Sequence, residues 1–188
     1  MFRPHSSANE LTDRHSINSA LREHIVEHVF IGEALRRLWQ CGIVNVEVLR
    51  SEFDAHGYDL VLARDHTVRH IQLKTGLAKQ PGDVSVPMSL AEKPSGCVIW
   101  ISVTEKLDLG PYFWFGGAAG EPLPDVVGFS IPLRATHNKL GVRPPRPNHR
   151  LIPKAAFKRL DSLDAVLGDL FGSIGNVLPE SANAHEAN

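Results

Sequence analysis

The sequence predicts an α/β domain in which helices flank a mixed sheet. Three observations lead to this prediction. An amphipathic segment of helical period lies near the N-terminus, runs rich in β-branched and aromatic residues occupy the middle, and a second amphipathic segment lies near the C-terminus. At 188 residues, with 43% hydrophobic and 22% charged residues, the chain has the size and composition typical of one globular domain with a substantial core.

The first helix is expected to begin after Ser16 or Asn18 and to end at Gly42, which can adopt the left-handed conformation that terminates helices. Valine-rich and apolar runs then predict strands over residues 44–50, 58–64, 67–74, 96–103 and 111–116. Prolines and glycines predict loops over 78–89 and 141–150, and the pattern over 153–172 predicts one or two amphipathic helices. The polar ends, 1–16 and 175–188, are expected to be disordered, which leaves 17–174 as a single domain.

Several features argue against a membrane or exported protein. The sequence has no run of about 18 apolar residues that could span a bilayer, and its N-terminus lacks the apolar segment of a signal peptide. Cys41 and Cys97 are too few for a disulfide framework or a four-thiolate zinc site, and their apolar surroundings predict reduced core residues. We therefore expect a cytoplasmic protein without a membrane partner.

The segment GYDLVLARDHTVRHIQLKTG, residues 57–76, predicts a hairpin with polar groups on one face. If Asp65 and His66 form the turn, Arg64 lies opposite Thr67 and the pairing continues along both strands. Alternation then gives one apolar face, interrupted by two arginines near the turn, and one polar face. The apolar face holds Tyr58, Leu60, Leu62, Ile71 and Leu73 with Arg64 and Arg69, and the polar face holds Asp59, Val61, Ala63, Val68, His70, Gln72 and Lys74.

The polar face combines a carboxylate, an amide and an ammonium, which are suitable groups for phosphodiester hydrolysis. Asp59 can bind a hard cation such as Mg²⁺, and the Gln72 oxygen could add a ligand. The metal would offset the charge of a phosphate and acidify a bound water, and Lys74 could orient that water or stabilise the developing charge. The alternative is a solvent-facing hairpin surface, on which Asp, Gln and Lys are common.

The pattern GYDLVL…IQLKT resembles the core motif of the PD-(D/E)xK nuclease superfamily, which includes Holliday-junction resolvases and many restriction endonucleases. The preceding IGEALRRLWQCGIVNV is similar to the helix of small members, and the likeness covers residues 27–76. It implies a restriction-endonuclease-like fold, a metal-binding aspartate at Asp59, a catalytic lysine at Lys74, and Mg²⁺ or Mn²⁺ as cofactor. Glu33 matches the helix glutamate that often joins the metal shell, with Glu23 and Glu27 of the same helix as alternatives.

Gln72 departs from this motif, because it stands where most members carry Glu or Asp. The resemblance implies that it takes part in catalysis as an uncharged metal ligand, as in the Q-x-K variant of methylation-directed restriction enzymes. Loss of that charge should weaken cation binding, so the alternative function is a catalytically inactive nucleic-acid-binding protein of the same fold. Tyr58 replaces the proline of the motif, and Asp54 adds a carboxylate of the kind that caps turns.

A basic segment predicts contact with nucleic acid. The net charge is −1, yet the interval between Asp125 and Asp161 holds eight Lys and Arg residues and no acidic residue. This local excess suits a polyanion, DNA being the favoured partner, and a solvated basic loop is the alternative. The candidate phosphate contacts, which should make the affinity strongly salt-dependent, are Lys139, Arg143, Arg146 and Arg150. A homodimer is compatible with this function, since nucleases that cut both strands are commonly dimers.

The motif HIVEH, residues 24–28, suggests a third hypothesis. It matches the H-x-x-E-H signature of inverted zinc proteases, in which His24 and His28 would bind zinc one helical turn apart and Glu27 would act as general base. Glu105 lies downstream, where a third ligand is expected, although in a predicted loop. The alternative is a pair of exposed histidines on a charged helix face.

Overall fold

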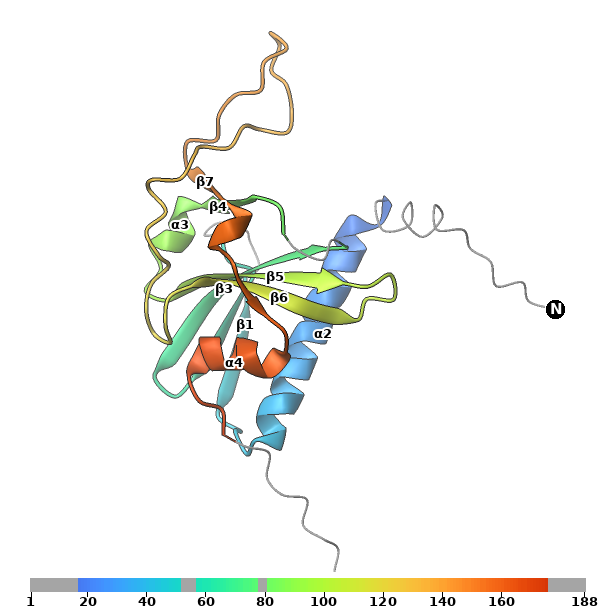
Figure 1. The fold of residues 1–188 in the computed structure, drawn as a ribbon, viewed down its shortest axis with the longest axis vertical. Coiled ribbons are helices and arrows are strands. Elements are labelled where there is room, and N and C mark those ends of the chain that lie inside the picture. The colour runs from blue at the N-terminus through green and yellow to red at the C-terminus, as the bar shows by residue number, and fades with distance from the viewer. Residues whose placement is uncertain (1–16, 52–56, 78–80, 176–188) are drawn as a thin grey trace, which may run out of the picture.

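A computed structural model describes residues 17–51, 57–77 and 81–175 (Figure 1). The ends expected to be disordered therefore lie outside the described residues, apart from Gly175. The helices are α2 (Ser19–Gln40), α3 (Met88–Ala91) and α4 (Leu163–Phe171), with a 3-10 turn η1 (Lys154–Ala156). The strands are β1 (Val46–Arg50), β2 (Leu60–Arg64), β3 (Thr67–Gly76), β4 (Val84–Pro87), β5 (Gly96–Val103), β6 (Leu109–Gly116), β7 (His149–Ile152) and β8 (Lys158–Leu160). None of the described helices has the length and apolar character needed to cross a membrane.

Six strands form a mixed sheet in the order β1-β2-β3-β5-β6-β8, and β4 pairs with β7 in a separate two-stranded sheet. Strands β3 and β5 run parallel, and the other described neighbours run antiparallel. This arrangement confirms the predicted mixed α/β architecture. The β2–β3 hairpin also has the predicted register, since Arg64 pairs with Thr67 and Leu60 with Ile71. As predicted, α2 is followed by a left-handed glycine, Gly42, with φ +75°.

The six-stranded sheet separates two hydrophobic cores. On one face, α2 and α4 pack over Leu60, Leu62 and Ile71 of the hairpin. On the other face, β4, β7 and α3 pack over a layer that includes Trp100 and Phe115. Four aromatic residues of β5 and β6 are buried in these cores, and none is more than 7% exposed: Trp100, Phe113, Trp114 and Phe115. Side chains of β3 therefore face one of two distinct environments.

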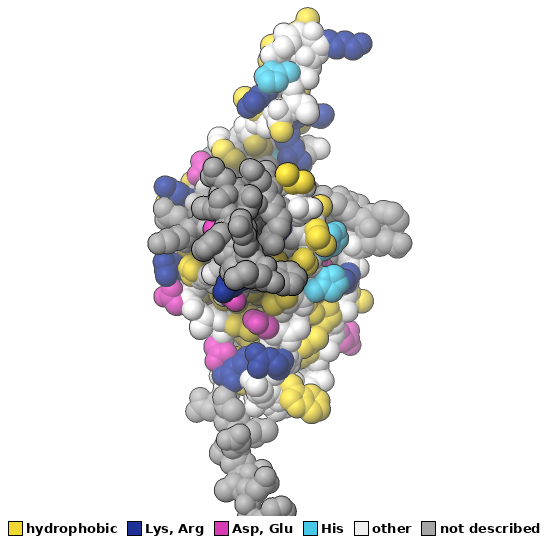
Figure 2. All heavy atoms as spheres, turned by 90° about the vertical axis from the view of Figure 1, so that its right-hand side faces the viewer, with side chains coloured by type: hydrophobic (Ala, Val, Ile, Leu, Met, Phe, Trp, Pro, Cys, Tyr) yellow, Lys and Arg dark blue, Asp and Glu magenta, His cyan; other side chains and the backbone are white. Residues whose placement is uncertain are grey.

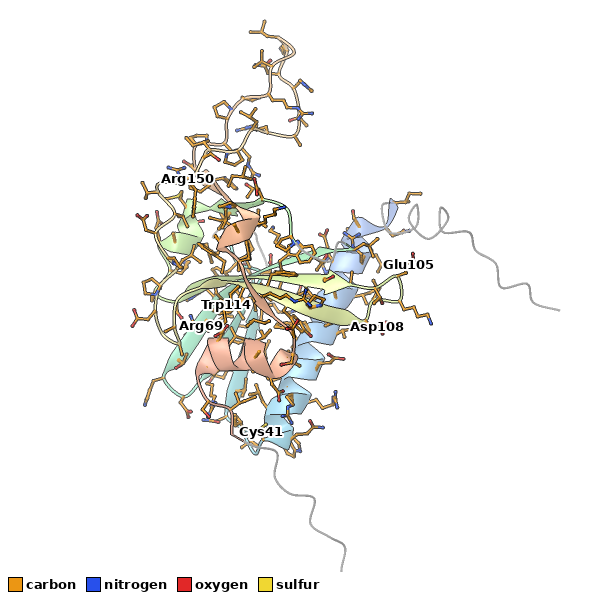
Figure 3. All side chains as sticks on the ribbon, viewed as in Figure 1. Cys41, Arg69, Glu105, Asp108, Trp114 and Arg150 are labelled. Atoms are coloured by element: carbon orange, nitrogen blue, oxygen red, sulfur yellow. The ribbon has the colours of Figure 1, made fainter. Side chains whose placement is uncertain are left out.

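Arg69 is fully buried on the α2–α4 face and joins β3 to α4 (Figure 3). Its Nε donates to the Leu170 carbonyl at 2.8 Å, and its Nη2 donates to the Asp169 carbonyl at 2.7 Å. These carbonyls lie in the last turn of α4, where helix carbonyls lack partners within the helix. The guanidinium also lies 5.4 Å from the centre of the Trp114 ring. Burial removes water from the guanidinium and lowers the pKa of Arg69. The carbonyls of α4 and the face of the Trp114 ring replace that water as partners of the charge.

The C-terminal region differs from the predicted one or two helices over 153–172. Residues Lys158–Leu160 instead form β8, which pairs with Tyr112–Trp114 of β6, and α4 begins only at Leu163. Ser162 caps α4, because its Oγ accepts a hydrogen bond from the Ala165 N–H at 3.2 Å. The open edge of β6 thus supplies hydrogen-bond partners that outweigh the local helical pattern. Strand β4 likewise forms within the predicted loop over 78–89, and β7 begins within the predicted loop over 141–150, because each strand supplies the other with hydrogen-bond partners.

Tyr58 does not share the apolar face of Leu60, contrary to the prediction from alternation. Strand β2 begins at Leu60, and Gly57 has φ +74° and lies so close to Pro87 that a Cβ would not fit. The regular alternation of β2 therefore does not extend back to Tyr58. The Tyr58 ring packs edge-on against His70 on the β4–β7 side, with 5.1 Å between ring centres.

The prediction that both cysteines are core residues is confirmed for Cys97 and is wrong for Cys41. Cys97 is buried, and burial raises the pKa of its thiol to about 12. Cys41 is only half-buried, because it follows the last residue of α2 at the surface end of that helix. Both are free thiols, as predicted.

Residues 131–148 form an arm, called here the basic arm, that projects from the body of the protein (Figures 1 and 2). Its limbs are joined near the base, where the Arg146 N–H donates to the Pro132 carbonyl at 2.8 Å. At the tip, Asn138 Oδ1 accepts a hydrogen bond from the Leu140 N–H at 2.9 Å. The arm is thus closed at both ends by hydrogen bonds although it contains no helix or strand.

Candidate functional site

The first of two adjoining cavities lies between the N-terminal half of α2 and the ends of β2 and β3. We call it the acid cavity, and its volume is about 360 Å³. Its lining residues are Ala20, Glu23, His24, Glu27, Asp59, Leu73, Lys74 and Thr75. The structure therefore brings Asp59 and Lys74 from two different strands to one cavity and adds two glutamates from α2. Lys74 has no ion pair within the described part of the chain.

A short hydrogen bond positions the Asp59 carboxylate. Its Oδ2 accepts from the Leu73 N–H at 2.6 Å, and the Asp59 N–H donates to the Ile71 carbonyl at 2.9 Å. The regular β2–β3 pairing ends at Leu60 and Ile71, so the carboxylate takes the place of the backbone carbonyl that a longer β2 would offer to the Leu73 N–H of β3. Because Leu73 lies between Gln72 and Lys74, this bond fixes Asp59 beside the Q-x-K segment.

The two helix glutamates of the acid cavity differ in their partners. Glu27 accepts from Arg50 Nε of β1 at 2.9 Å, and its side chain is 18% exposed. Glu23, one turn earlier on the same face of α2, is 60% exposed and lies 3.6 Å from Arg22 Nη2. One carboxylate is therefore held by a neighbouring strand, and the other stands at the mouth of the cavity.

Glu33 does not line the acid cavity. It follows Glu27 by six residues, or about 1.7 helical turns, so its side chain leaves α2 on a different side. There it lies near Tyr112, whose pKa is raised to about 12 by burial and by the charge of Glu33. Among the three acids of α2 considered for the metal shell, the structure places Glu23 and Glu27 with Asp59, and it places Glu33 elsewhere.

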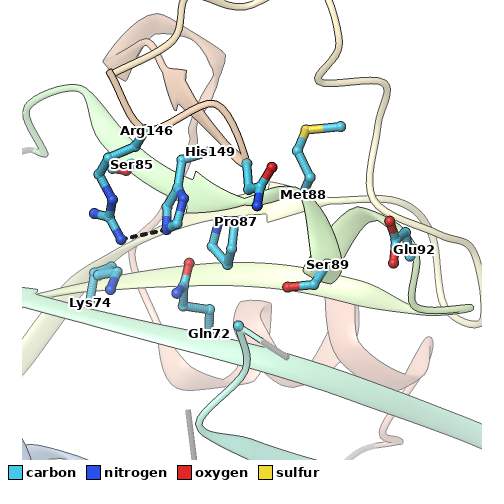
Figure 4. Close-up of a pocket in the computed structure, with 11 residues that line it drawn as sticks. Gln72, Lys74, Ser85, Pro87, Met88, Ser89, Glu92, Arg146 and His149 are labelled. Carbon is cyan, nitrogen blue, oxygen red and sulfur yellow. Dashed lines mark hydrogen bonds between the residues drawn. The ribbon is translucent and has the colours of Figure 1, made fainter. Parts of the chain in front are cut away.

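Gln72 lines the second cavity, on the β4–β7 side of the sheet (Figure 4). We call it the Gln72 cavity, and its volume is about 580 Å³. Its lining residues are Gly57, Gln72, Lys74, Ser85, Pro87, Met88, Ser89, Glu92, Arg146, Asn148 and His149. Asp59 is not among them, so the structure does not bring Gln72 and Asp59 to a common cavity. Lys74 lines both cavities and connects them.

The donor chemistry of the acid cavity suits a divalent cation, which is the cofactor implied by the sequence. Asp59 and one of the α2 glutamates offer hard oxygen ligands, and Mg²⁺ is commonly bound through one or two carboxylates together with substrate phosphates. In the described residues, no group of three or more His, Cys, Asp and Glu side chains is arranged to hold a metal ion. Gln72, whose oxygen faces the neighbouring cavity, is not placed to complete the shell with Asp59.

The His28 ring of the HIVEH motif has partners other than a metal. His28 Nδ1 donates to the His24 carbonyl at 2.7 Å, and with that tautomer its Nε2 accepts from Arg50 Nη1 at 3.0 Å. Glu105 lies in the β5–β6 turn and lines a different cavity with Leu77 (Figure 3). The structure therefore does not bring Glu105 to the two histidines as a third zinc ligand.

The four cations proposed to contact nucleic acid are in three different situations. Lys139 and Arg143 are exposed on the outer part of the basic arm, and Figure 2 shows Lys and Arg side chains along it. Arg146, at the base of the arm, lines the Gln72 cavity, and its Nη2 lies 2.6 Å from His149 Nε2. Arg150 lies on β7, and its guanidinium donates to the carbonyls of Pro147 and His149, each at 2.8 Å. Arg150 thus has a structural role in holding the base of the arm.

Sequence reasoning missed Ser85 and His149 of the Gln72 cavity and Arg50 beside the acid cavity. Ser85 and His149 belong to the β4–β7 pair, which no local pattern predicts because its strands are distant in the chain. The predicted strand over 44–50 does contain Arg50, but only the packing of β1 against α2 reveals its pairing with Glu27. Asp54, named as a further carboxylate, lies outside the described residues.

Comparisons with models of protein families, with curated proteins and with solved structures gave no match to this chain. The functional proposal therefore rests on the residues and on their geometry.

Proposed function

We propose that this protein is a divalent-metal-dependent nuclease with a restriction-endonuclease-like fold, which hydrolyses phosphodiester bonds in nucleic acid, DNA being the favoured substrate. One observation carries the proposal: Asp59 and Lys74 line the same cavity, together with two carboxylates of α2. This is the combination that the motif resemblance implies, although the helix acids are Glu23 and Glu27 in place of Glu33. The absence of an ion pair of Lys74 within the described residues supports a role for its ammonium toward a ligand.

In the proposed mechanism, Asp59 and Glu23 or Glu27 would hold Mg²⁺ or Mn²⁺. When bound, the metal would offset the charge of the scissile phosphate and acidify a water molecule. The hydrogen bond from the Leu73 N–H keeps the Asp59 carboxylate oriented, so little reorganisation is needed on substrate binding. Lys74, at the junction of the two cavities, would position the attacking water or stabilise the charge that develops on the phosphate.

Substrate would be held by the basic arm. Lys139 and Arg143 are exposed and would contact phosphates of the backbone at a distance from the acid cavity. Arg146 lines the Gln72 cavity together with Lys74, so a strand bound along the arm would be led toward the reacting groups. This arrangement supports nucleic acid as the substrate, because positive side chains continue from the exposed part of the arm, through Arg146 at its base, to Lys74.

Nicking of supercoiled DNA tests the proposal. Asp59→Asn keeps an oxygen that accepts from the Leu73 N–H and removes the charge, and Lys74→Met keeps the side-chain length. Each should lower metal-dependent nicking by about 10²–10³-fold, as removal of one transition-state contact does elsewhere. The matched controls, Asp108→Asn and Lys106→Met, change the same residue types in the β5–β6 turn and should leave the rate unchanged. Equal rates for all four variants would contradict the proposal.

A second candidate function is favoured by a specific observation. Gln72 is uncharged and lines a different cavity from Asp59. Glu27 is paired with Arg50, so the acid cavity has less negative charge than its three carboxylates suggest. This favours a nucleic-acid-binding protein of the same fold without catalytic activity. The nicking experiment separates the two functions, since salt-sensitive DNA binding without metal-dependent nicking would establish the second.

A further inference from the structure

The Gln72 cavity contains buried polar atoms without partners. Gln72 is only 6% exposed, and neither its Oε1 nor the Ser85 Oγ has a hydrogen-bond partner among the described residues. Buried polar groups are nearly always hydrogen-bonded, because leaving them unpaired is costly. Two such atoms in one open cavity of about 580 Å³ therefore indicate a polar ligand, since a volume of about 300–1,000 Å³ is typical of small-molecule sites.

The cavity is also electrically polarised. Figure 4 shows the Arg146 guanidinium and the Lys74 side chain at one end, with Gln72 in the centre and Glu92 at the other end. A guanidinium only donates hydrogen bonds, so His149 Nε2 accepts from Arg146 and holds it over the cavity. The ligand should therefore carry an anionic group at the cation end and hydrogen-bond donors toward Gln72 and Glu92.

We propose that the Gln72 cavity binds one unpaired nucleotide of a nucleic acid strand. Its phosphate lies between Lys74 and Arg146, which are suited to phosphate oxygens, and its base or sugar donates a hydrogen bond to Gln72 Oε1. The inference rests on the proposed function, because the nucleotide is taken as the unit of the substrate strand adjacent to the acid cavity. Lys74, which lines both cavities, would bind the phosphate that joins the two sites.

A cavity that takes one unpaired nucleotide selects a class of substrate. A base that is stacked and paired in a duplex cannot enter a cavity of this kind, whereas a base in a single strand, a flap or a junction can do so at little cost. The protein should therefore prefer nucleic acid with unpaired nucleotides to intact duplex. Gln72 then has a substrate-binding role, which explains why an amide, able to both donate and accept, stands at a position where the motif has an acid.

Binding of dAMP to the full chain in EDTA, measured by calorimetry against inorganic phosphate and deoxyadenosine, tests the inference without any cleavage. We expect one site per chain, with dAMP bound more tightly than either fragment. Gln72→Met and Arg146→Met should each weaken dAMP binding by about tenfold, the effect of losing one hydrogen bond to a ligand. Lys106→Met, in the β5–β6 turn and outside the lining of the cavity, is the control and should bind dAMP as the wild type does.

The stability of Gln72→Met shows whether a loss of dAMP binding could come from misfolding. It removes an unpaired buried acceptor while nearly conserving volume, so the melting temperature of the free protein should be unchanged or raised. The inference is overturned if dAMP binds no more tightly than phosphate, or if Gln72→Met binds dAMP as the wild type does. Those results leave the nicking experiment with Asp59→Asn unaffected, and a protein that binds dAMP through Gln72 but does not nick DNA loses the nuclease proposal alone.

Discussion

Neutralising the exposed cations of the basic arm should reduce the salt dependence of DNA binding by a calculable amount. Lys139 and Arg143 are exposed, and neither has an ion pair within the described ranges. Each phosphate neutralised on duplex DNA contributes about 0.9 to the slope of log K against log salt. Lys139→Ala combined with Arg143→Ala should therefore make the slope shallower by about 1.8. Between about 50 and 200 mM salt, the wild type should lose roughly tenfold more affinity than the double variant.

The assay is fluorescence anisotropy of a labelled duplex in EDTA, which prevents cleavage, across a series of salt concentrations. Lys106→Met is the informative control, because Lys106 is an exposed cation of the β5–β6 turn, outside the basic arm. It should leave the slope unchanged even though it removes a positive charge. The assignment is refuted if the double variant keeps the wild-type slope, or if Lys106→Met makes the slope shallower by as much as a single arm substitution.

Three further predictions concern stability and the acid cavity. Arg69→Met removes two short hydrogen bonds to α4 carbonyls and should destabilise the protein by about 3 kcal/mol. The melting temperature should therefore fall by roughly 6–12 °C. A fall of less than about 1 °C would show that those carbonyls find other partners. The hydrogen bond from Arg37 lowers the pKa of Asp164 from its ordinary value of 3.8. A carboxylate whose pKa is lower in the folded protein than in the unfolded chain stabilises the fold at pH values above the unfolded pKa. Asp164→Asn should thus lower the urea midpoint at neutral pH, and the difference should shrink as the pH falls below 3.8; a constant difference would contradict this. Arg50→Met removes the partner of Glu27 and should lower the Mg²⁺ concentration for half-maximal nicking, whereas an unchanged value would exclude Glu27 as a ligand.

The hairpin shows what the sequence can predict. Strict alternation over Leu60–Arg64 and Thr67–Leu73 has one register that segregates apolar from polar side chains, and the structure adopts it. The same reasoning fails at Tyr58, because alternation holds only within a strand and Gly57 ends the regular geometry. Local pattern is therefore reliable where a strand is long, and it loses meaning one or two residues beyond its end.

The site was less predictable than the fold, for a physical reason. Glu23, Glu27 and Glu33 are all exposed or half-buried on α2, and only the packing of the helix on the sheet decides which of them meets Asp59. The Gln72 cavity depends on β4 and β7, whose pairing joins distant segments. Residues brought together by long-range pairing leave no spacing in the sequence from which their proximity could be inferred.

The location of Mn²⁺ in crystals of the protein bound to DNA would test the central claim most directly, because manganese can be identified by anomalous scattering. We predict a manganese peak in the acid cavity, within coordination distance of Asp59 and of Glu23 or Glu27, with a DNA phosphate between the ion and Lys74. A protein that holds DNA and manganese with the ion bound elsewhere, or with Lys74 turned away from the phosphate, would contradict the assignment of this cavity as the catalytic centre.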